Sequence, residues 1–450
     1  MITSPAFTGR RYAVLGLARS GMATAEALLA SGAQVTAWDR QDGPRAVLAA
    51  RNDPACTIAD PLEIELAGFD GVVVSPGVPL NTHPIAARAR AAGVPVIGDI
   101  ELFAQARAHL PPHKVVGITG TNGKSTTTAL VHHICAVAGL PVTMGGNIGL
   151  PILAQEPLLA GGVYVLELSS YQIDLTFSLD CDVAVLLNIT PDHLDRYDGF
   201  DAYKQSKLRL FGMQTEPHVA IVADADESVL QHMLDLPTGP GSLSLPPDEP
   251  NSGVHDQGAF PALQGPHNAQ NIWAAASVAQ HLGISAEALN DALRTYPGLP
   301  HRMERIGEFD GVLFVNDSKA TNPASTAPAL SAYPRIHWIV GGLPKGDDLD
   351  ECAPGFPHVV RAYTIGEAGP RFADILQPHM PVERCEMMCE AVRRAIHHAQ
   401  PGEVVLLSPA CASFDQFRDY EKRGDAFREI VLSLTAGGTD DICCEPGRAA

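Results

Sequence analysis

The sequence GTNGKST at residues 120–126 constrains the fold more than any other stretch of this chain. An apolar run precedes it at 115–118, and a segment with helical character follows at 127–131. A glycine-rich turn between a strand and a helix presents backbone N–H groups and the positive helix end to an anion. In such a loop Lys124 would reach the β- and γ-phosphates of a nucleotide, and the Ser125 hydroxyl would hold Mg²⁺. The general phosphate-loop pattern also requires glycine at position 118, which is Ile118 here, so we predict a polyphosphate site built on a variant loop.

The length of the chain predicts three domains, because 450 residues are too many for one core and a domain averages about 150. We expect them at 1–110, 111–299 and 300–436, with prolines near 112 and 300 as hinges and a disordered tail over 437–450. Apolar strands alternate with helical segments throughout. The fold class is therefore α/β, with an N-terminal Rossmann-like domain, a central P-loop ATPase-like domain and a C-terminal Rossmann-like domain.

Composition excludes several kinds of partner. The net charge of −20 argues against nucleic acid, whose binding depends on clustered Lys and Arg. No stretch approaches the ~20 apolar residues needed to cross a bilayer, and no signal-peptide pattern is visible at the N-terminus. We therefore expect a cytoplasmic protein with no membrane insertion.

The first predicted βαβ unit partly matches a dinucleotide fingerprint. A strand at 11–15 leads into GLARSG at 16–21, and the next strand ends at Asp39. Ala18 replaces the middle glycine, which hinders close approach of a pyrophosphate, so a nucleotide-shaped ligand other than NAD is equally compatible. SPGVP at 75–79 follows a third strand and forms a rigid turn suited to a ligand-binding rim.

Three residues of the central domain are candidates for chemistry. Glu167 ends an apolar strand beside the phosphate loop, where a carboxylate is well placed to hold Mg²⁺. His193 follows the next strand, and either a metal ligand or a structural histidine fits there. Lys207 lies in YKQSKL, which resembles an exposed helix, so from its surroundings alone we expect a solvated surface lysine.

The third domain places polar loops after successive strands. DSKATN at 317–322, GGLPK at 341–345 and SPACASFD at 408–415 each follow an apolar run, and strand C-termini of open α/β sheets meet at a ligand site. Arg302, at the preceding junction, carries a guanidinium that matches phosphate oxygens.

Together these motifs resemble the Mur ligase family, ATP-dependent amide-forming enzymes that build the peptide stem of peptidoglycan. GTNGKST, ELSSYQ (167–172), NITPDHLDRY (188–197), GPHNAQN (265–271) and HRME (301–304) occur in the family order, and the resemblance spans about residues 10–430. DSKATN and SPACASFDQF look like the loops of the family members that add D-glutamate. Sibling ligases and folylpolyglutamate synthases carry a different loop after the aspartate at position 317.

The resemblance implies the substrates UDP-N-acetylmuramoyl-L-alanine, D-glutamate and ATP, two Mg²⁺ ions, and a monomer. It implies catalytic roles for Lys124, His193, Lys207 and Arg302, with Lys207 carbamylated by CO₂. The implied ATP contacts are Gly120, Thr121, Asn122, Gly123, Lys124, Ser125, Thr126, Asn271, Arg302 and Asp317. The implied metal ligands are Ser125, Glu167, His193 and Lys207. The implied contacts to the UDP substrate are Ala18, Arg19, Ser20, Asp39, Arg40, Gly77 and Asn147. The implied glutamate contacts are Lys319, Thr321, Lys345, Ser413 and Tyr420, the last aligning with a position that is often Phe.

The implied reaction runs through an acyl phosphate, which domain closure would protect from water. Three alternatives carry distinct expectations. A sibling ligase such as a folylpolyglutamate synthase would use a folate, a regulatory nucleotide-binding protein would bind ATP without ligation, and an NAD-dependent oxidoreductase would rely on the first domain. The third-domain loops weigh against a sibling ligase, and the intact motifs weigh against a protein without catalysis. Ala18 weighs against an NAD-dependent oxidoreductase.

Overall fold

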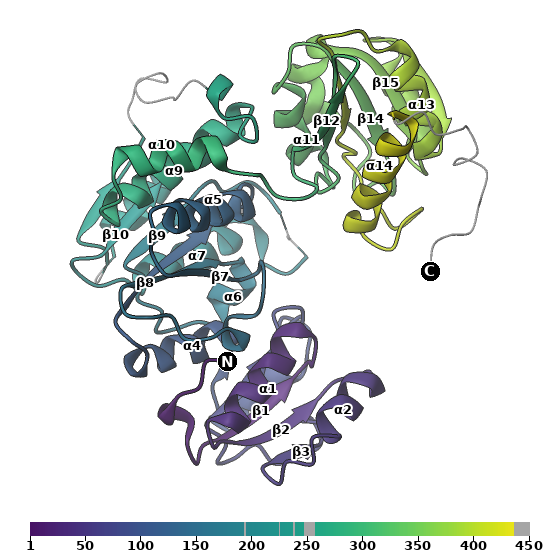
Figure 1. The fold of residues 1–450 in the computed structure, drawn as a ribbon. Helices are drawn as coiled ribbons and strands as arrows, with labels where there is room; N and C mark the ends of the chain where they lie inside the picture. Colours follow the sequence, from purple (N-terminus) through teal and green to yellow (C-terminus); the bar gives the residue numbers. More distant parts are fainter. Residues whose placement is uncertain (193–194, 225, 237–238, 247–256, 436–450) are drawn as a thin grey trace. The chain divides into compact units, whose positions relative to one another are not determined.

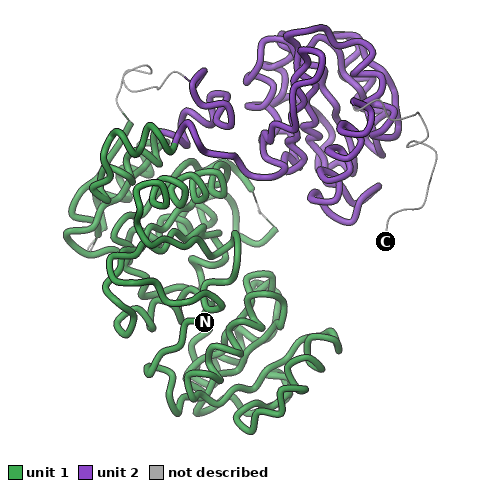
Figure 2. Tube along the Cα trace, in the orientation of Figure 1, with its two compact units in different colours: residues 1–252, 273–292 green, residues 253–272, 293–450 purple. Residues whose placement is uncertain are grey.

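The computed structural model describes residues 1–192, 195–224, 226–236, 239–246 and 257–435. The expected tail at 437–450 and the candidate residue His193 lie outside the described residues. The chain divides into two compact units, Met1–Ser252 with Trp273–Ala292 and Gly253–Ile272 with Leu293–Ala450 (Figure 2). The described parts contain three sheets with helices packed on them, as predicted (Figure 1).

The N-terminal sheet is fully parallel, with the strand order β3-β2-β1-β4-β5. Its strands are β1 (Arg11–Leu15), β2 (Gln34–Trp38), β3 (Cys56–Ile58), β4 (Gly71–Val74) and β5 (Val96–Ile97). Its helices are α1 (Arg19–Ala30), α2 (Asp42–Ala49) and α3 (Ile85–Ala91). The strands at 11–15, 34–38 and 71–74 lie where the apolar runs predict them. All four residues of β4 are buried, as in a strand covered on both faces.

The central sheet is also parallel and has the order β11-β10-β9-β6-β8-β7. Its strands are β6 (His113–Thr119), β7 (Val142–Gly146), β8 (Gly162–Glu167), β9 (Val183–Leu186), β10 (Val219–Val222) and β11 (Ser242–Ser244). The accompanying helices are α4 (Asp99–Ala106), α5 (Lys124–Val137), α6 (Ser170–Asp174), α7 (Gly199–Gly212), α8 (Glu227–Leu234), α9 (Pro266–His281) and α10 (Ala286–Thr295). Because all strands run the same way, the segments that follow β6, β8 and β9 emerge at one edge, which positions the site.

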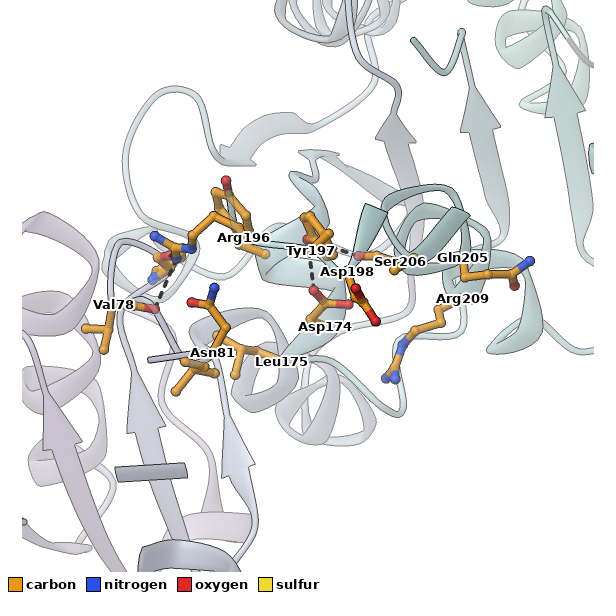
Figure 3. A pocket seen from close by; sticks show the side chains of 14 residues that line it. Val78, Asn81, Asp174, Leu175, Arg196, Tyr197, Asp198, Gln205, Ser206 and Arg209 are labelled. Atoms are coloured by element: carbon orange, nitrogen blue, oxygen red, sulfur yellow. Dashed lines mark hydrogen bonds between the residues drawn. The ribbon is translucent and has the colours of Figure 1, made fainter. Parts of the chain in front are cut away.

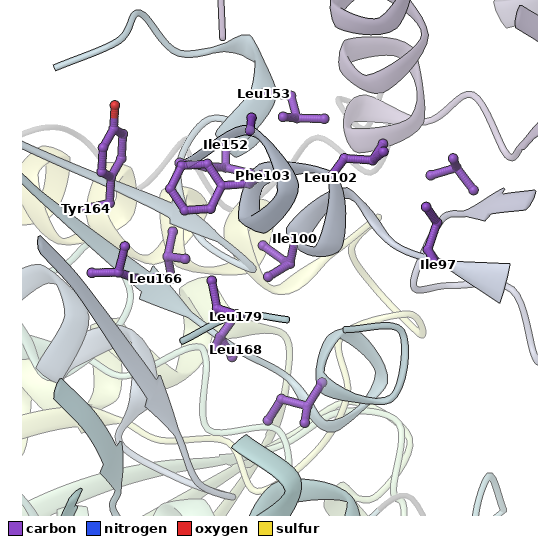
Figure 4. Packing of buried hydrophobic residues seen from close by; sticks show 14 of the residues in the cluster. Ile97, Ile100, Leu102, Phe103, Ile152, Leu153, Tyr164, Leu166, Leu168 and Leu179 are labelled. Carbon is purple, nitrogen blue, oxygen red and sulfur yellow. The ribbon is translucent and has the colours of Figure 1, made fainter. Parts of the chain in front are cut away.

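Helix α4 joins the first two sheets through one hydrophobic core. Its Phe103 side chain meets Tyr164 of β8 at a ring-centroid distance of 5.0 Å (Figure 4). Glu101 of the same helix accepts hydrogen bonds from the backbone N–H groups of Phe177 (2.7 Å) and Ser178 (3.0 Å). Residues of both sheets belong to this core cluster, so α4 already packs on the central sheet before the boundary expected at residue 110.

The C-terminal sheet has the order β12-β13-β17-β14-β15-β16. Its strands are β12 (Glu304–Phe309), β13 (Val312–Asn316), β14 (Ile336–Gly341), β15 (Val359–Ile365), β16 (Val382–Glu386) and β17 (Val404–Leu407). Its helices are α11 (Pro323–Leu330), α12 (Gly369–Leu376), α13 (Met388–His398) and α14 (Tyr420–Thr435). Trp338 and Ile339 point to opposite faces and enter different core clusters, so helices cover both sides. Strand β12, which the sequence analysis did not identify, pairs antiparallel to β13.

No helix among the described residues is both long enough and apolar enough to cross a lipid bilayer.

Candidate active site

The phosphate loop connects β6 to α5, as predicted. Gly123 stands immediately before the helix with φ 84°, and Gly120 has φ 153°, both in the region that favours glycine. A Cβ on Gly120 would also approach Leu187 Cβ to 3.0 Å. Ile118 lies inside β6, fully buried and paired with Glu167 and Val185. The glycine of the general phosphate-loop pattern is absent at position 118 because this position belongs to the packed strand and not to the turn.

Two lysines converge on the start of this loop. Lys124 Nζ donates hydrogen bonds to the carbonyl oxygens of Gly120 and Thr121, each at 2.8 Å. Lys207 Nζ, which comes from α7, donates to the same Gly120 oxygen at 2.8 Å. The phosphate loop and α7 are therefore joined at one carbonyl group.

The expectation of a solvated Lys207 is wrong, because its side chain is 2 % exposed. Helix α7 packs the face that carries Lys207 against the phosphate loop. The Lys207 ammonium lies 4.7 Å from the centre of the Tyr203 ring. Burial, and secondarily the charge of Lys124, lowers the pKa of Lys207 to about 6. The amine is therefore largely neutral at pH 7 and is able to act as a nucleophile.

Glu167 at the end of β8 has the environment of a cation ligand. Its side chain is 2 % exposed, and its Oε1 accepts a hydrogen bond from Asn147 Nδ2 at 2.9 Å. Its Oε2 is buried and accepts no hydrogen bond from any described residue. A buried carboxylate oxygen of this kind costs free energy unless a cation or water binds it. The Ser125 hydroxyl, buried at the start of α5, adds an oxygen donor of the type that Mg²⁺ prefers.

Protein side chains alone do not complete a metal centre in the described part of the chain. No group of three His, Cys, Asp or Glu side chains is arranged there to hold an ion. A divalent ion beside Glu167 and Ser125 would take further oxygens from other molecules, as Mg²⁺ in nucleotide sites does with phosphates and water.

Several of the residues predicted to hold the UDP group lie at the loop after β1. Asp39 accepts hydrogen bonds from the backbone N–H groups of Leu17 (2.6 Å) and Gln41 (2.9 Å), so its carboxylate also shapes this loop. Arg19 Nη2 donates to the Gly149 carbonyl at 2.7 Å, which brings the segment after Asn147 to the same place. Ala18 precedes α1 without a side-chain cap. The remaining predicted contacts of this group are the half-buried Ser20 and the exposed Arg40 and Gly77.

The structure also brings the predicted glutamate-binding residues of the C-terminal sheet together. Lys345 Nζ donates to Thr321 Oγ1 at 3.3 Å. Lys319 Nζ lies 4.1 Å from the centre of the Tyr420 ring, in a cation–π contact. Ser413 is buried in the loop after β17, which pairs with the loop after β14 through Leu343 and Ala412. Cationic and hydroxyl groups thus lie where these loops meet.

Asp317, directly after β13, is buried beneath these loops. Its Oδ2 accepts from Ser408 Oγ at 2.8 Å and its Oδ1 from the Met303 backbone N–H at 3.2 Å. Burial raises the pKa of Asp317 to about 7, although these bonds and the charge of Arg302 oppose the shift. Asn271, another predicted ATP contact, is buried and donates to Asn268 Oδ1 at 3.0 Å.

Arg423 of α14 binds two of these loops, and the sequence analysis did not identify it. Its side chain is 1 % exposed, and its guanidinium donates to Ser318 Oγ (3.0 Å) and O (2.8 Å), Cys411 O (3.0 Å) and Ala412 O (3.1 Å). It therefore ties the loop after β13 to the loop after β17. Burial lowers the pKa of Arg423 to about 10. The surrounding sequence YEKRGD is that of an ordinary charged helix and carries no signal for this role.

Comparison with known proteins gives the family that the sequence motifs resemble. Residues 10–98 match the Mur ligase MurD-like N-terminal domain, residues 118–238 the Mur ligase middle domain, and residues 301–411 the Mur ligase glutamate ligase domain. The chain belongs to the Mur ligase family. Within that family, its N-terminal sheet is of the MurD-like kind.

Two similar relatives are named UDP-N-acetylmuramoylalanine--D-glutamate ligase. The protein from Novosphingobium aromaticivorans is 67% identical over 96% of this chain and 97% of its own length. The protein from Sphingopyxis alaskensis is 59% identical over 97% of this chain and 100% of its own length. The solved structure of MurF ligase from Thermotoga maritima in complex with ADP shares the fold, with a TM-score of 0.59 and 15% identity over 96% of each chain.

Proposed function

We propose that this protein is an ATP-dependent ligase that joins D-glutamate to UDP-N-acetylmuramoyl-L-alanine in peptidoglycan precursor synthesis. The observation that carries the proposal is the 67% identity, over nearly all of both chains, with a ligase named for this reaction. The convergence of Lys124 and Lys207 on the phosphate loop supports the ATP-dependent step. We expect the enzyme to act as a monomer in the cytoplasm, as the family resemblance implies.

The loop at 120–126 would hold the ATP phosphates. Its backbone N–H groups and the N-terminus of α5 offer an anion site, and Lys124 would exchange carbonyl contacts for phosphate oxygens. Ser125, Glu167 and Lys207 would hold Mg²⁺, and His193 is proposed as a further ligand. The bound ions would offset repulsion between the ATP phosphates and the attacking carboxylate.

Lys207 would serve this site as a carbamate. A neutral amine adds to CO₂ through its nitrogen lone pair and then loses a proton, which leaves a carboxylate-like anion on the side chain. The low pKa of Lys207 supports this chemistry, because a protonated amine has no lone pair to donate. The product would replace a largely neutral amine beside Lys124 with an anion, which the Lys124 ammonium would attract.

Two separate sets of residues would hold the two substrates to be joined. We assign the UDP group to the loop around Gly16, Asp39 and Asn147, and D-glutamate to Lys319, Thr321, Lys345, Ser413 and Tyr420. The cluster of cationic and hydroxyl groups in the second set suits a dicarboxylate. The domains would span 1–110, 111–299 and 300–436, and hinges near Pro112 and Pro300 would close them over the reactants.

In the reaction, the L-alanyl carboxylate attacks the γ-phosphorus of ATP and forms an acyl phosphate with loss of ADP. Lys124 and Arg302 would stabilise the charge on the transferred phosphoryl group. The glutamate amine then attacks the activated carbonyl, and phosphate leaves from the tetrahedral intermediate.

The test is phosphate release by the purified protein with ATP, Mg²⁺ and UDP-N-acetylmuramoyl-L-alanine, with D- or L-glutamate in parallel reactions. Release that requires both the UDP substrate and D-glutamate is expected. ATP binding without any release would indicate a non-catalytic nucleotide-binding protein, and release with a folate in place of the UDP substrate would indicate a sibling ligase. Either result would overturn the proposal.

A further inference from the structure

Arg196 links two segments of the first unit that are far apart in the sequence. Its Nη2 donates to the carbonyl oxygens of Val78 (3.1 Å) and Pro76 (3.4 Å), which flank Gly77 in the turn after β4 (Figure 3). Asn81, a few residues beyond that turn, returns a hydrogen bond from its Nδ2 to the Asp195 carbonyl at 3.1 Å. Each segment therefore contributes one side chain that binds the backbone of the other.

The Arg196 guanidinium rests on a platform of tyrosines. It lies 4.5 Å from the centre of the Tyr171 ring, and Tyr171 stacks on Tyr197 with an interplanar angle of 11°. The Tyr197 hydroxyl donates to Asp174 Oδ2 at 2.9 Å and lies 3.3 Å from Ser206 Oγ. Stacking leaves the edge of the guanidinium, where its N–H groups lie, directed at the turn.

This platform is continuous with the phosphate loop. Ser206 is the neighbour of Lys207 on α7, and it donates to the Ser170 carbonyl at 3.1 Å, which fixes α7 to α6. Lys207 in turn binds the Gly120 carbonyl. An unbroken series of contacts thus runs from the Pro76–Val78 backbone through Arg196 and α7 to the phosphate loop.

The turn packs on the core of the N-terminal sheet through Val78 and Leu80, and it borders a cavity on the side that faces α7. A cavity of about 480 Å³ lies beside it, lined by Val78 and Leu80 from the turn and by Ala202, Gln205 and Arg209 from α7 (Figure 3). A close-packed core would hold a segment by contact alone, but a cavity provides no atoms to do so. On the cavity side, the hydrogen bonds of Arg196 and Asn81 tie the turn to the segment that precedes α7.

We infer that Arg196 is a positioning residue that sets the distance between the UDP-substrate turn at Gly77 and the ATP loop at Gly120. The inference rests on the proposed function, in which Gly77 contacts the UDP substrate. Arg196 acts through the backbone of Pro76 and Val78 and not by touching a reactant. Loss of Arg196 releases the turn, so the UDP substrate binds more weakly and its carboxylate is misaligned with the γ-phosphate.

The test compares Arg196→Met, which keeps length and stacking but not the hydrogen bonds, with Arg196→Lys and the matched control Arg209→Met. Arg209 lines the same cavity but donates to the Thr176 carbonyl, outside the turn. We expect Arg196→Met to raise KM for UDP-N-acetylmuramoyl-L-alanine about tenfold, as for loss of a hydrogen bond from a charged donor, and to lower kcat. KM for ATP and the melting temperature should stay unchanged. Arg196→Lys should recover part of the loss, and Arg209→Met should match the wild type.

Hydrogen–deuterium exchange of the backbone amides of Gly77, Val78, Leu80 and Asn81 gives a readout that does not depend on turnover. Exchange there should accelerate in Arg196→Met and not in Arg209→Met. Unchanged exchange and unchanged KM, or equal changes in KM for ATP and the UDP substrate, would overturn the inference while leaving the proposed function intact. A wild-type protein that forms no product from ATP, UDP-N-acetylmuramoyl-L-alanine and D-glutamate would overturn both.

Discussion

Lys207 Nζ donates a 2.8 Å hydrogen bond to the carbonyl oxygen of Gly120, the first residue of the phosphate loop. A cationic ammonium buried beside the ammonium of Lys124 is unfavourable, which is why the pKa of Lys207 falls to about 6. Such a residue is expensive to keep for stability alone. Its place at the loop therefore favours a role in the reaction.

Substitution Lys207→Ala is expected to abolish ligation. Loss of one preorganised charged group at a phosphoryl-transfer site lowers kcat by about 10²–10³. If the lysine acts as a carbamate, adding formate or acetate should restore part of the rate, because a small carboxylate fits the space left by the side chain. Phosphate release with and without these anions measures both effects.

The matched control for this variant is Lys204→Ala on the same helix. Lys204 Nζ donates to Ser228 Oγ at 2.8 Å and pairs with Asp226 at 3.6 Å, away from the phosphate loop. Lys204→Ala should retain activity. Full activity of Lys207→Ala without added carboxylate would remove Lys207 from the site.

Substitution Lys345→Ala is expected to weaken glutamate binding much more than ATP binding. The Lys345 ammonium lies 3.3 Å from Thr321 Oγ1, which belongs to the same loop as Lys319, and an ammonium there is able to bind a carboxylate. KM for D-glutamate should rise about tenfold or more, the equivalent of one charge-assisted hydrogen bond. Steady-state kinetics with each substrate varied in turn would measure this. Exposed Lys422, which pairs only with Asp425 among described residues, supplies the control variant Lys422→Ala. Equal losses for ATP and glutamate would contradict the role given to Lys345.

Substitution Asp317→Asn is expected to stabilise the protein in a pH-dependent way. The pKa of Asp317 is about 7 in the fold, against about 3.8 in an unfolded chain, so the folded state binds the proton more tightly. The contribution of protonated Asp317 to the free energy of unfolding is fully present below pH 4, and it is lost as the pH rises through 7. Asparagine carries no charge and can still accept from the Met303 N–H and donate to Ser408 Oγ.

The gain in unfolding free energy for Asp317→Asn should therefore grow from pH 5 to pH 8 and reach the order of 1–4 kcal/mol. Urea unfolding at the two pH values would measure it. Exposed Asp374, paired with Arg384, gives the control Asp374→Asn, which should show no such slope. If the gain in unfolding free energy for Asp317→Asn does not change with pH, then the fold does not destabilise the charged form of Asp317. The same variant should lose activity if Asp317 contacts ATP.

The sequence predicts the parts of this fold that depend on local patterns. Strand β1, helix α1 and strand β2 follow from apolar runs separated by a glycine turn, and GTNGKST predicts the loop between β6 and α5. These features are readable because strand burial and the need for φ > 0 select residue types directly.

Other features depend on contacts between segments distant in sequence, which local patterns do not encode. Lys207 occurs in a polar helical stretch, and only the packing of α7 on the phosphate loop buries it. The residues of antiparallel β12 alternate between partly buried and exposed, and none of them is fully buried. The strand therefore contains no apolar run that would reveal it in the sequence. Arg423 looks like any charged helix residue until α14 carries it beneath two loops.

Substitution Arg423→Met is expected to destabilise the C-terminal unit and weaken D-glutamate binding together. Methionine keeps most of the volume of the side chain, but the carbonyl oxygens of Ser318, Cys411 and Ala412 would lose their donor. Leaving a buried carbonyl oxygen without its donor costs about 1–3 kcal/mol, and three of them lose a donor here. Arg418→Met, at a side chain that is 89% exposed, should change neither quantity.

The two effects of Arg423→Met should be separable by Arg423→Lys. Lysine keeps the positive charge but has a single nitrogen, so it is able to bind carbonyls of one loop and not to bridge both. We expect its urea midpoint to lie between those of the wild type and Arg423→Met, while its KM for D-glutamate stays close to that of Arg423→Met. If Arg423→Lys instead binds D-glutamate like the wild type, then charge and not bridging is what the site requires. Arg423 would in that case not be the residue that holds the two loops in register.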